Sequence, residues 1–154
     1  LLQPGVDPLI HMESLIREPF IVAVPSDHPL SKKRSIKAES MIHENIILPP
    51  RTSVLNSIVR DCFNASGYEP RIQEATGIIK TILGLISGGF GISVVPASTQ
   101  RIKVENVTYR PMVKPPIAET VLAWRKGTTA PMLDSFVQVA KQVAKADMLM
   151  KQNH

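Results

Sequence analysis

Short runs of apolar, often β-branched residues recur along the chain, and each is closed by proline or by a polar turn. Phe20 to Val24 is followed by Pro25, and Asn45 to Leu48 is followed by a pair of prolines. Continuous apolar runs this short, with such flanks, predict buried strands rather than helices. The same criteria predict strands at about residues 20–24, 45–48, 71–75, 91–95, 107–110 and 119–125.

Between these runs the apolar residues recur at steps of three and four, the period of an amphipathic helix. The stripes predict helices at about residues 54–66, 77–87 and 131–146, with a frayed end from Met148 to His154. Ser53 and Thr76 are expected to be the N-caps of the first two helices, and Gly67 the C-terminal cap of the first. The last helix is expected to bury a face formed by Met132, Leu133, Phe136, Val137, Ala140, Val143 and Ala144.

Strands and helices alternate along the whole chain, and this order predicts an α/β fold with a largely parallel sheet. Apolar residues make up 44% of the 154 residues, enough for a packed core. The net charge is +5, but its only dense cluster is Lys32 to Arg34, for which a solvated loop is favoured over a DNA contact. The single cysteine excludes an internal disulfide framework and fits the reducing cytoplasm.

Two further features concern what surrounds the chain. No apolar run reaches the ~18 residues that a membrane helix needs, so no membrane partner is expected. The chain begins at Leu1 rather than at methionine, and we expect it to be a piece of a longer protein.

Residues suited to catalysis are present but not in a catalytic pattern. The four histidines lack metal-ligand spacing. Ser26, Asp27 and His28 are adjacent, whereas the side chains of a catalytic triad converge from separate backbone positions. The glycines between Gly84 and Gly91 follow a predicted helix, whereas a phosphate-binding loop precedes one, so they predict a turn. The sequence therefore predicts no enzyme activity, no cofactor and no metal site.

The starts of two predicted helices offer a different chemistry. Ser53 and Thr76 each follow a predicted strand, at the carboxyl edge of the sheet, where open α/β proteins bind ligands. The amides of a helix start suit a carboxylate or another small anion. Considered alone, such caps are structural in most proteins, so the residues themselves indicate only a possible anion-binding lobe.

Several segments resemble the effector-binding domain of LysR-type bacterial transcription regulators. Residues 81–98 (TILGLISGGFGISVVPAS) are strongly similar to part of it. Residues 17–25 (REPFIVAVP), followed by the Asp27–Leu30 turn (DHPL), resemble its crossing strand. Residues 107–111 and 123–125 resemble its return strand and a late strand. Together these motifs cover nearly the whole chain in the family's order. Residues 97–100 are closest to regulators of aromatic-compound catabolism, which sense cis,cis-muconate or benzoate-like acids.

The resemblance implies a periplasmic-binding-protein-like α/β fold of two Rossmann-like subdomains, with an effector in the cleft between them. Residues 25–110 would form the second subdomain, and residues 1–24 and 111–154 an incomplete first subdomain. The family's winged helix-turn-helix, its linker helix and the opening strand and helix of the first subdomain would lie outside this chain. DNA would then be bound only through that winged helix-turn-helix, by a cytoplasmic homo-oligomer, either a dimer or a tetramer.

The family's cleft loop matches residues 48–56, and its second cleft strand matches residues 74–76. The effector-binding residues that the resemblance implies are Pro50, Arg51, Thr52, Ser53, Val54, Leu55, Glu74, Ala75 and Thr76. Their expected ligand is a small anionic metabolite, a carboxylate by preference. A solute-binding protein of a transport system is the main alternative, and an enzyme on the same scaffold comes third. The Asp-His-Pro-Leu and Val-Pro-Ala-Ser motifs favour the regulator.

Overall fold

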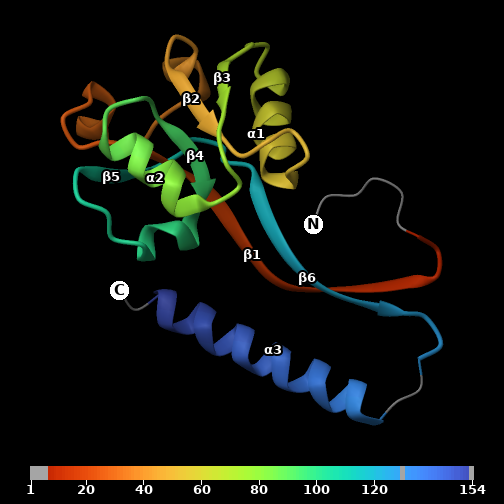
Figure 1. The fold of residues 1–154 in the computed structure, drawn as a ribbon. Helices are drawn as coiled ribbons and strands as arrows, with labels where there is room; N and C mark the ends of the chain where they lie inside the picture. The colour runs from red at the N-terminus through yellow and green to blue at the C-terminus, as the bar shows by residue number, and fades with distance from the viewer. Residues whose placement is uncertain (1–6, 129–130, 153–154) are drawn as a thin grey trace. The chain divides into compact units, whose positions relative to one another are not determined.

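The computed structural model describes residues 7–128 and 131–152 and divides the chain into two compact units (Figure 1). Unit 1 consists of Leu1–Arg17 and Glu119–His154, and unit 2 of Glu18–Ala118. Strands β1 (Ile10–Pro25) and β6 (Ile117–Arg125) contribute residues to both units. Unit 2 therefore includes more residues than the expected range 25–110, because the second part of β1 and the first two residues of β6 belong to it. Its assignment as the family's second subdomain stays a prediction.

The sheet of unit 2 is built around two pairings. Strand β2 (Asn45–Leu48) pairs in parallel with β3 (Arg71–Glu74), and β1 pairs antiparallel with both β4 (Ser93–Pro96) and β5 (Val107–Pro111). A parallel bridge between Ile46 and Ile92 places β4 beside β2. The order is thus β3-β2-β4-β1-β5, and only β1 runs against the others. The parallel sheet that the sequence predicted is found from β3 to β4, whereas β1 pairs antiparallel with β4 and with β5, so the prediction is confirmed for only part of the sheet.

Alternate residues of these strands face opposite sides of the sheet, as the period of two in a strand requires. Helix α1 (Val54–Ala65) covers one side through Val59 and Phe63, and α2 (Ile79–Ser87) covers the other through Ile82, Leu83 and Ile86 (Figure 1). The strand residues under α1 include Phe20, Val22, Val24, Ile46, Leu48 and Val94, and those under α2 include Ile21, Ala23, Ile47 and Val95. Unit 2 is therefore a three-layer α/β arrangement. Three short 3-10 helices complete it, at Pro29–Lys32 (η1), Ala38–Met41 (η2) and Ala97–Arg101 (η3).

Both predicted ends of α1 are confirmed. The Ser53 hydroxyl accepts a hydrogen bond from the Leu55 amide at 3.3 Å, so Ser53 is the N-cap. Gly67 has a φ of +76° and donates to the carbonyl of Asn64, while the next amide, of Tyr68, donates to the carbonyl of Phe63. This pair of bonds is a Schellman motif, which favours glycine at its left-handed position.

The predicted N-cap of α2 is wrong. The helix begins at Ile79, and Ile78 occupies the cap position without a side-chain hydrogen bond. Thr76 instead accepts from the amide of Ile78 at 3.2 Å, which closes a separate turn before the helix. In a helix N-cap and in a threonine turn alike, the threonine hydroxyl can accept a hydrogen bond from the amide two residues later. The local sequence therefore does not distinguish the two.

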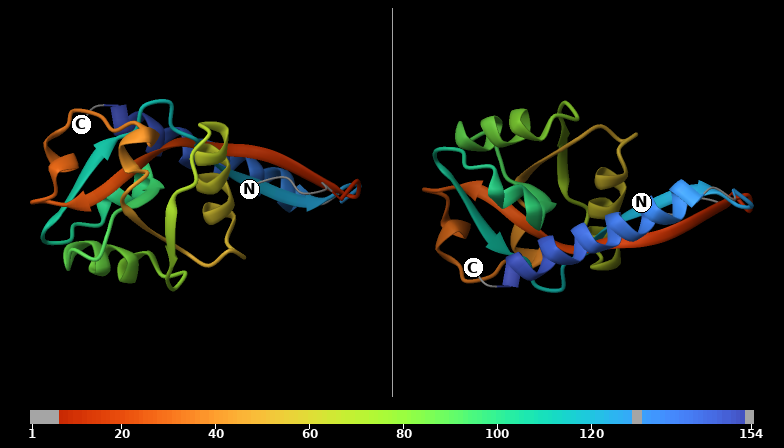
Figure 2. Two further views of the ribbon diagram at one scale, coloured as in Figure 1. Left: turned by 90° about the horizontal axis from the view of Figure 1, so that it is seen from above. Right: turned by 90° about the horizontal axis from the view of Figure 1, so that it is seen from below.

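Unit 1 contains the first part of β1, most of β6 and helix α3 (Pro131–Gln152), which lies along the two strands (Figure 2). An ion pair joins Lys141 of α3 to Glu13 of β1. Helix α3 continues to Gln152, so residues 148–152 of the predicted frayed end are helical, while residues 153–154 lie outside the described part. The helix of unit 1 is thus longer than the sequence predicted.

The buried face of α3 is narrower than predicted. Val137 and Ala144 are buried and Leu133 and Ala140 half-buried, but Phe136 is 59% exposed. The other exposed members of the expected face are Met132 and Val143. Two strands give the helix only a narrow surface, and a stripe with steps of four, three and four residues fills it. The expectation that Phe136 is a core residue is therefore wrong for this chain.

Candidate functional site

The nine predicted site residues come from two neighbouring strand ends. Leu48 of β2 lies opposite Glu74 of β3, and the amide of Ala75 donates to the carbonyl of Leu48 at 2.8 Å. Because the strands are parallel, the loop of residues 49–53 and the segment of residues 74–76 leave the sheet at the same edge. Helix α1 begins directly after the loop. The structure therefore brings Arg51 of the loop and Glu74 of β3 together.

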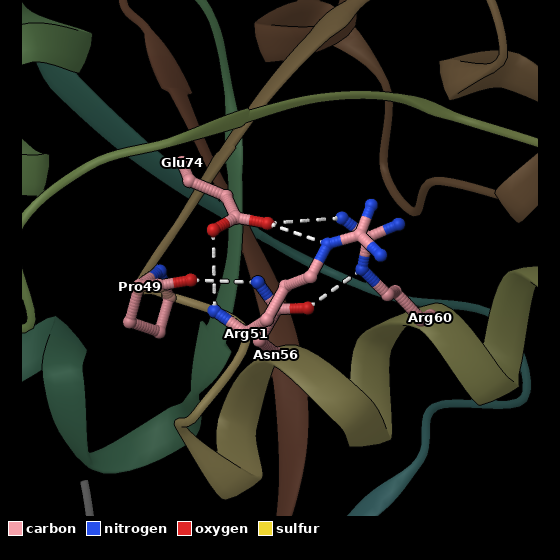
Figure 3. A network of polar contacts seen from close by, with 5 residues as sticks. All are labelled: Pro49, Arg51, Asn56, Arg60 and Glu74. Atoms are coloured by element: carbon pink, nitrogen blue, oxygen red, sulfur yellow. Dashed lines mark hydrogen bonds and ion pairs between the residues drawn. The ribbon is translucent and has the colours of Figure 1, made fainter.

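An ionic cluster joins the two segments (Figure 3). The carboxylate of Glu74 accepts from Arg51 Nε at 2.9 Å and from the Arg51 amide at 3.3 Å. Arg60 Nη2 donates to the same carboxylate at 3.4 Å. Two guanidinium groups and one carboxylate leave a formal charge of +1. The Arg51 side chain is 74% exposed, so this pairing adds little to stability but leaves a cation at the edge of the sheet.

Asn56 and Arg60 are the residues of this cluster that the sequence analysis missed. Asn56 is 1% exposed, and its Nδ2 donates to the carbonyl of Pro49 at 2.6 Å. Its Oδ1 accepts from Arg60 Nε at 2.7 Å. The asparagine thereby fixes the loop to the first turn of α1 and directs Arg60 toward Glu74. The sequence signal for this contact was that Asn56 and Arg60 are polar residues four positions apart on one helix, a spacing that places their side chains next to each other.

Backbone amides at the start of α1 form the second part of the site. The amides of Arg51, Ser53 and Leu55 donate to Glu74, Pro50 and the Ser53 hydroxyl, respectively. Within the described part of the chain, the amides of Thr52 and Val54 have no acceptor. The first amides of a helix lack intrahelical partners and carry a partial positive charge. Two such amides beside Arg51 suit a small anion.

The remaining predicted residues contribute less directly. Leu55 packs against the core cluster under α1, and Ala75 against the cluster under α2. Thr76 is exposed, and its hydroxyl is engaged by the amide of Ile78. The hydrogen bonds and ion pairs of the described residues join none of these three side chains to the amides of Thr52 and Val54. Their role in ligand binding stays a prediction.

Other chemistry is sparse in the described residues. No group of three or more histidine, cysteine, aspartate or glutamate side chains there is placed to hold a metal ion. Burial raises the pKa of the Cys62 thiol above its ordinary value, which keeps the thiol protonated. No helix in residues 7–128 and 131–152 is both long and apolar enough to span a membrane.

Known proteins are similar to this chain in sequence. The family model described as LysR substrate binding domain matches residues 1–145. The HTH-type transcriptional regulator BenM of Acinetobacter baylyi is 32% identical over 142 residues, which are 89% of this chain and 47% of BenM. The HTH-type transcriptional regulator AlsR of Bacillus subtilis is 30% identical over 135 residues, which are 85% of this chain and 44% of AlsR. The chain thus spans about half the length of the curated relatives it matches.

A solved structure of the BenM effector binding domain with its effector benzoate has a TM-score of 0.81 and is 30% identical to this chain. The match covers 94% of this chain and 68% of that one. The fold is accordingly the periplasmic-binding-protein-like α/β fold of LysR effector domains, as predicted. The matched relatives are transcription regulators, and a transport protein is not favoured. On the match over residues 1–145, the chain belongs to the LysR substrate-binding domain family, the effector-binding domain of LysR-type regulators.

Proposed function

We propose that this chain senses a small carboxylate at the start of α1, and that the protein containing it regulates transcription in response. The amides of Thr52 and Val54, without an acceptor in the described chain and next to Arg51, are the observation that carries the proposal. They would hold the carboxylate of the effector. The hydroxyl of Ser53 accepts from Leu55, so its own hydrogen can still be donated to the anion.

The electrostatics of the edge favour an anion. Glu74 would repel a carboxylate if it stood alone, but Arg51 and Arg60 both pair with it. The net charge of this trio is +1, and the helix start adds its partial positive charge. The proposal therefore needs no additional cation.

The likeness to BenM supports the choice of ligand class. BenM is described with its effector benzoate, an aromatic carboxylate. We take benzoate as the first probe for this chain, with benzamide as its uncharged control. The rest of the site would come from the remaining predicted residues: Pro50, Leu55, Glu74, Ala75 and Thr76.

The wider activity is part of the same proposal. The whole protein would act as a cytoplasmic homo-oligomer, a dimer or a tetramer. It would bind DNA through a winged helix-turn-helix outside this chain. The relatives support this because they are HTH-type regulators about twice as long as the segment they share with this chain.

One substitution separates ligand binding from folding. Val54 is the first residue of α1, where proline is well tolerated because the amide has no intrahelical partner. Ser53 is extended, with φ −81° and ψ 132°, which is the conformation required before proline. Val54→Pro thus removes one amide hydrogen and leaves the helix in place. Val54→Ala is the matched control, since it shortens the side chain and keeps the amide.

Isothermal titration of the chain with small carboxylates, benzoate first, tests the proposal. We expect Val54→Pro to weaken carboxylate binding by about 1.5–3 kcal/mol, roughly 10- to 150-fold, the contribution of a hydrogen bond to a charged group. Val54→Ala should bind like the parent chain, and benzamide should not bind at this level. Equal dissociation constants for Val54→Pro and Val54→Ala would refute the site.

A further inference from the structure

The carboxylate of Glu74 already occupies donors at the edge where the proposed site lies (Figure 3). Its Oε2 accepts from the amide of Arg51, which belongs to the same loop as the amide of Thr52. Its Oε1 accepts from Arg51 Nε. A backbone amide and a guanidinium group are the kinds of donor that a free carboxylate also uses. Glu74 is therefore bound to this loop by the same chemistry that would bind an effector.

The two arginines that pair with Glu74 differ in how firmly they are held. The Arg51 side chain is 74% exposed, and within the described residues its guanidinium group donates only to Glu74. The Arg60 side chain is 28% exposed, and its Nε also donates to Oδ1 of the buried Asn56 at 2.7 Å. An exposed ion pair contributes little to stability. Arg51 can therefore change its partner at little cost, whereas Arg60 is held beside Glu74.

This difference allows an exchange of partners. If the Arg51 side chain left Glu74 for an effector carboxylate, Arg60 would still neutralise Glu74. One exposed ion pair would then replace another, so Glu74 and the effector compete for the same guanidinium group. Glu74 also repels a second carboxylate at this edge, through a Coulomb interaction that salt weakens.

We propose that Glu74 is an internal competitor of the effector, which lowers the affinity of the site for carboxylates by occupying Arg51. The inference rests on the proposed function and adds the way in which the affinity of that site is set. When a carboxylate binds, Arg51 changes its partner and Arg60 stays with Glu74. The competition raises the effector concentration at which the site fills.

Isothermal titration of three chains with benzoate tests the competition. Glu74→Gln keeps an oxygen for the Arg51 amide but removes the charge, so it should bind benzoate about 3- to 10-fold more tightly than the parent, the size expected for one or two exposed charge pairs. Glu69→Gln is the matched control, because Glu69 is exposed and lies just before the other end of β3. It changes the net charge equally and should bind like the parent.

Salt dependence shows whether the gain in affinity comes from charge. At about 1 M ionic strength the Debye length is only about 3 Å, so exposed charges are largely screened. The ratio of the dissociation constants of the parent and Glu74→Gln should then fall towards one. A purely structural effect of the substitution would leave this ratio unchanged.

The side-chain Nε–Hε resonances of the two arginines report the exchange of partners in the parent chain. During titration with benzoate the Arg51 resonance should shift in a saturable manner, because Arg51 Nε leaves the carboxylate of Glu74. The Arg60 resonance should stay nearly unchanged, because Arg60 Nε donates to Asn56. Arg51→Lys identifies the first resonance by its loss.

The outcomes separate this inference from the proposed function. If the parent binds benzoate, equal dissociation constants for Glu74→Gln and Glu69→Gln would overturn the inference and leave the site in place, as would weaker binding by Glu74→Gln. An Arg51 resonance that does not shift while benzoate saturates the parent would also overturn it, even if Glu74→Gln does not fold. Binding by Glu74→Gln alone would support the competition. If neither chain binds benzoate or another small carboxylate, the carboxylate site is refuted and the inference with it.

Discussion

Substitution of Asn56 by alanine should lower the free energy of unfolding of unit 2, because the Asn56 side chain is buried and hydrogen-bonded. The side chain is 1% exposed and makes hydrogen bonds of 2.6 Å to the Pro49 carbonyl and 2.7 Å to Arg60 Nε. Alanine leaves the buried carbonyl of Pro49 without this donor, at a cost of about 1–3 kcal/mol. Arg60 is partly exposed, so water can replace its lost acceptor. The better helix propensity of alanine returns about 0.5 kcal/mol. The balance is a loss of about 0.5–2.5 kcal/mol.

Urea unfolding followed by circular dichroism measures this loss through the midpoint at constant slope. Asn64 is the matched control, because it is an exposed asparagine in the same helix. Asn64→Ala should change the free energy of unfolding by no more than about 0.5 kcal/mol. If Asn56→Ala and Asn64→Ala had equal effects, the contact between Asn56 and the Pro49 loop would not hold the site as described.

Two further pairs of substitutions test the packing of each unit. A Cβ at Gly91 would lie 2.3 Å from the carbonyl oxygen of Asn45, so Gly91→Ala should lower the thermal midpoint sharply, whereas Gly84→Ala, with nothing within 4 Å, should leave it unchanged or raise it. A higher midpoint for Gly91→Ala would contradict the close approach of β2 and β4. In α3, Phe136→Ala should cost less than about 1 kcal/mol because the ring is exposed, while Val137→Ala should cost about 1–3 kcal/mol in urea unfolding. A larger loss of unfolding free energy for Phe136→Ala than for Val137→Ala would show that Phe136 is a core residue.

The sequence predicted those features that depend on neighbouring residues. The apolar runs marked β2, β4 and the second part of β1 because these strands are buried on both faces, whereas β3 and β5 are more exposed. The cap of α1 at Ser53 and its end at Gly67 were predictable because each uses backbone groups within a few residues. The first ten residues of β1 were missed, since polar side chains alternate irregularly there on a strand with little cover.

Features that depend on distant segments were not predictable in the same way. Glu74 meets Arg60 across 14 positions, and Glu18 meets Ser98 across 80, so neither pairing leaves a local pattern. The width of the buried face of α3 was overestimated. Periodicity shows which residues of a helix are apolar, but it does not show how wide a surface the helix packs against. The family likeness located the strand-to-helix loop, but the amides of Thr52 and Val54 emerged only with the backbone.

We propose that a small carboxylate binds to the start of α1, and a titration followed by nuclear magnetic resonance tests this. Amide proton and nitrogen chemical shifts of the chain would be recorded during titration with benzoate and then with other small carboxylates. Binding at the proposed site should shift the amides of Thr52 and Val54 in a saturable manner, together with those of their neighbours in residues 51–55. Saturable binding of a carboxylate that leaves the amide shifts of Thr52 and Val54 unchanged would show that the carboxylate does not bind at the start of α1.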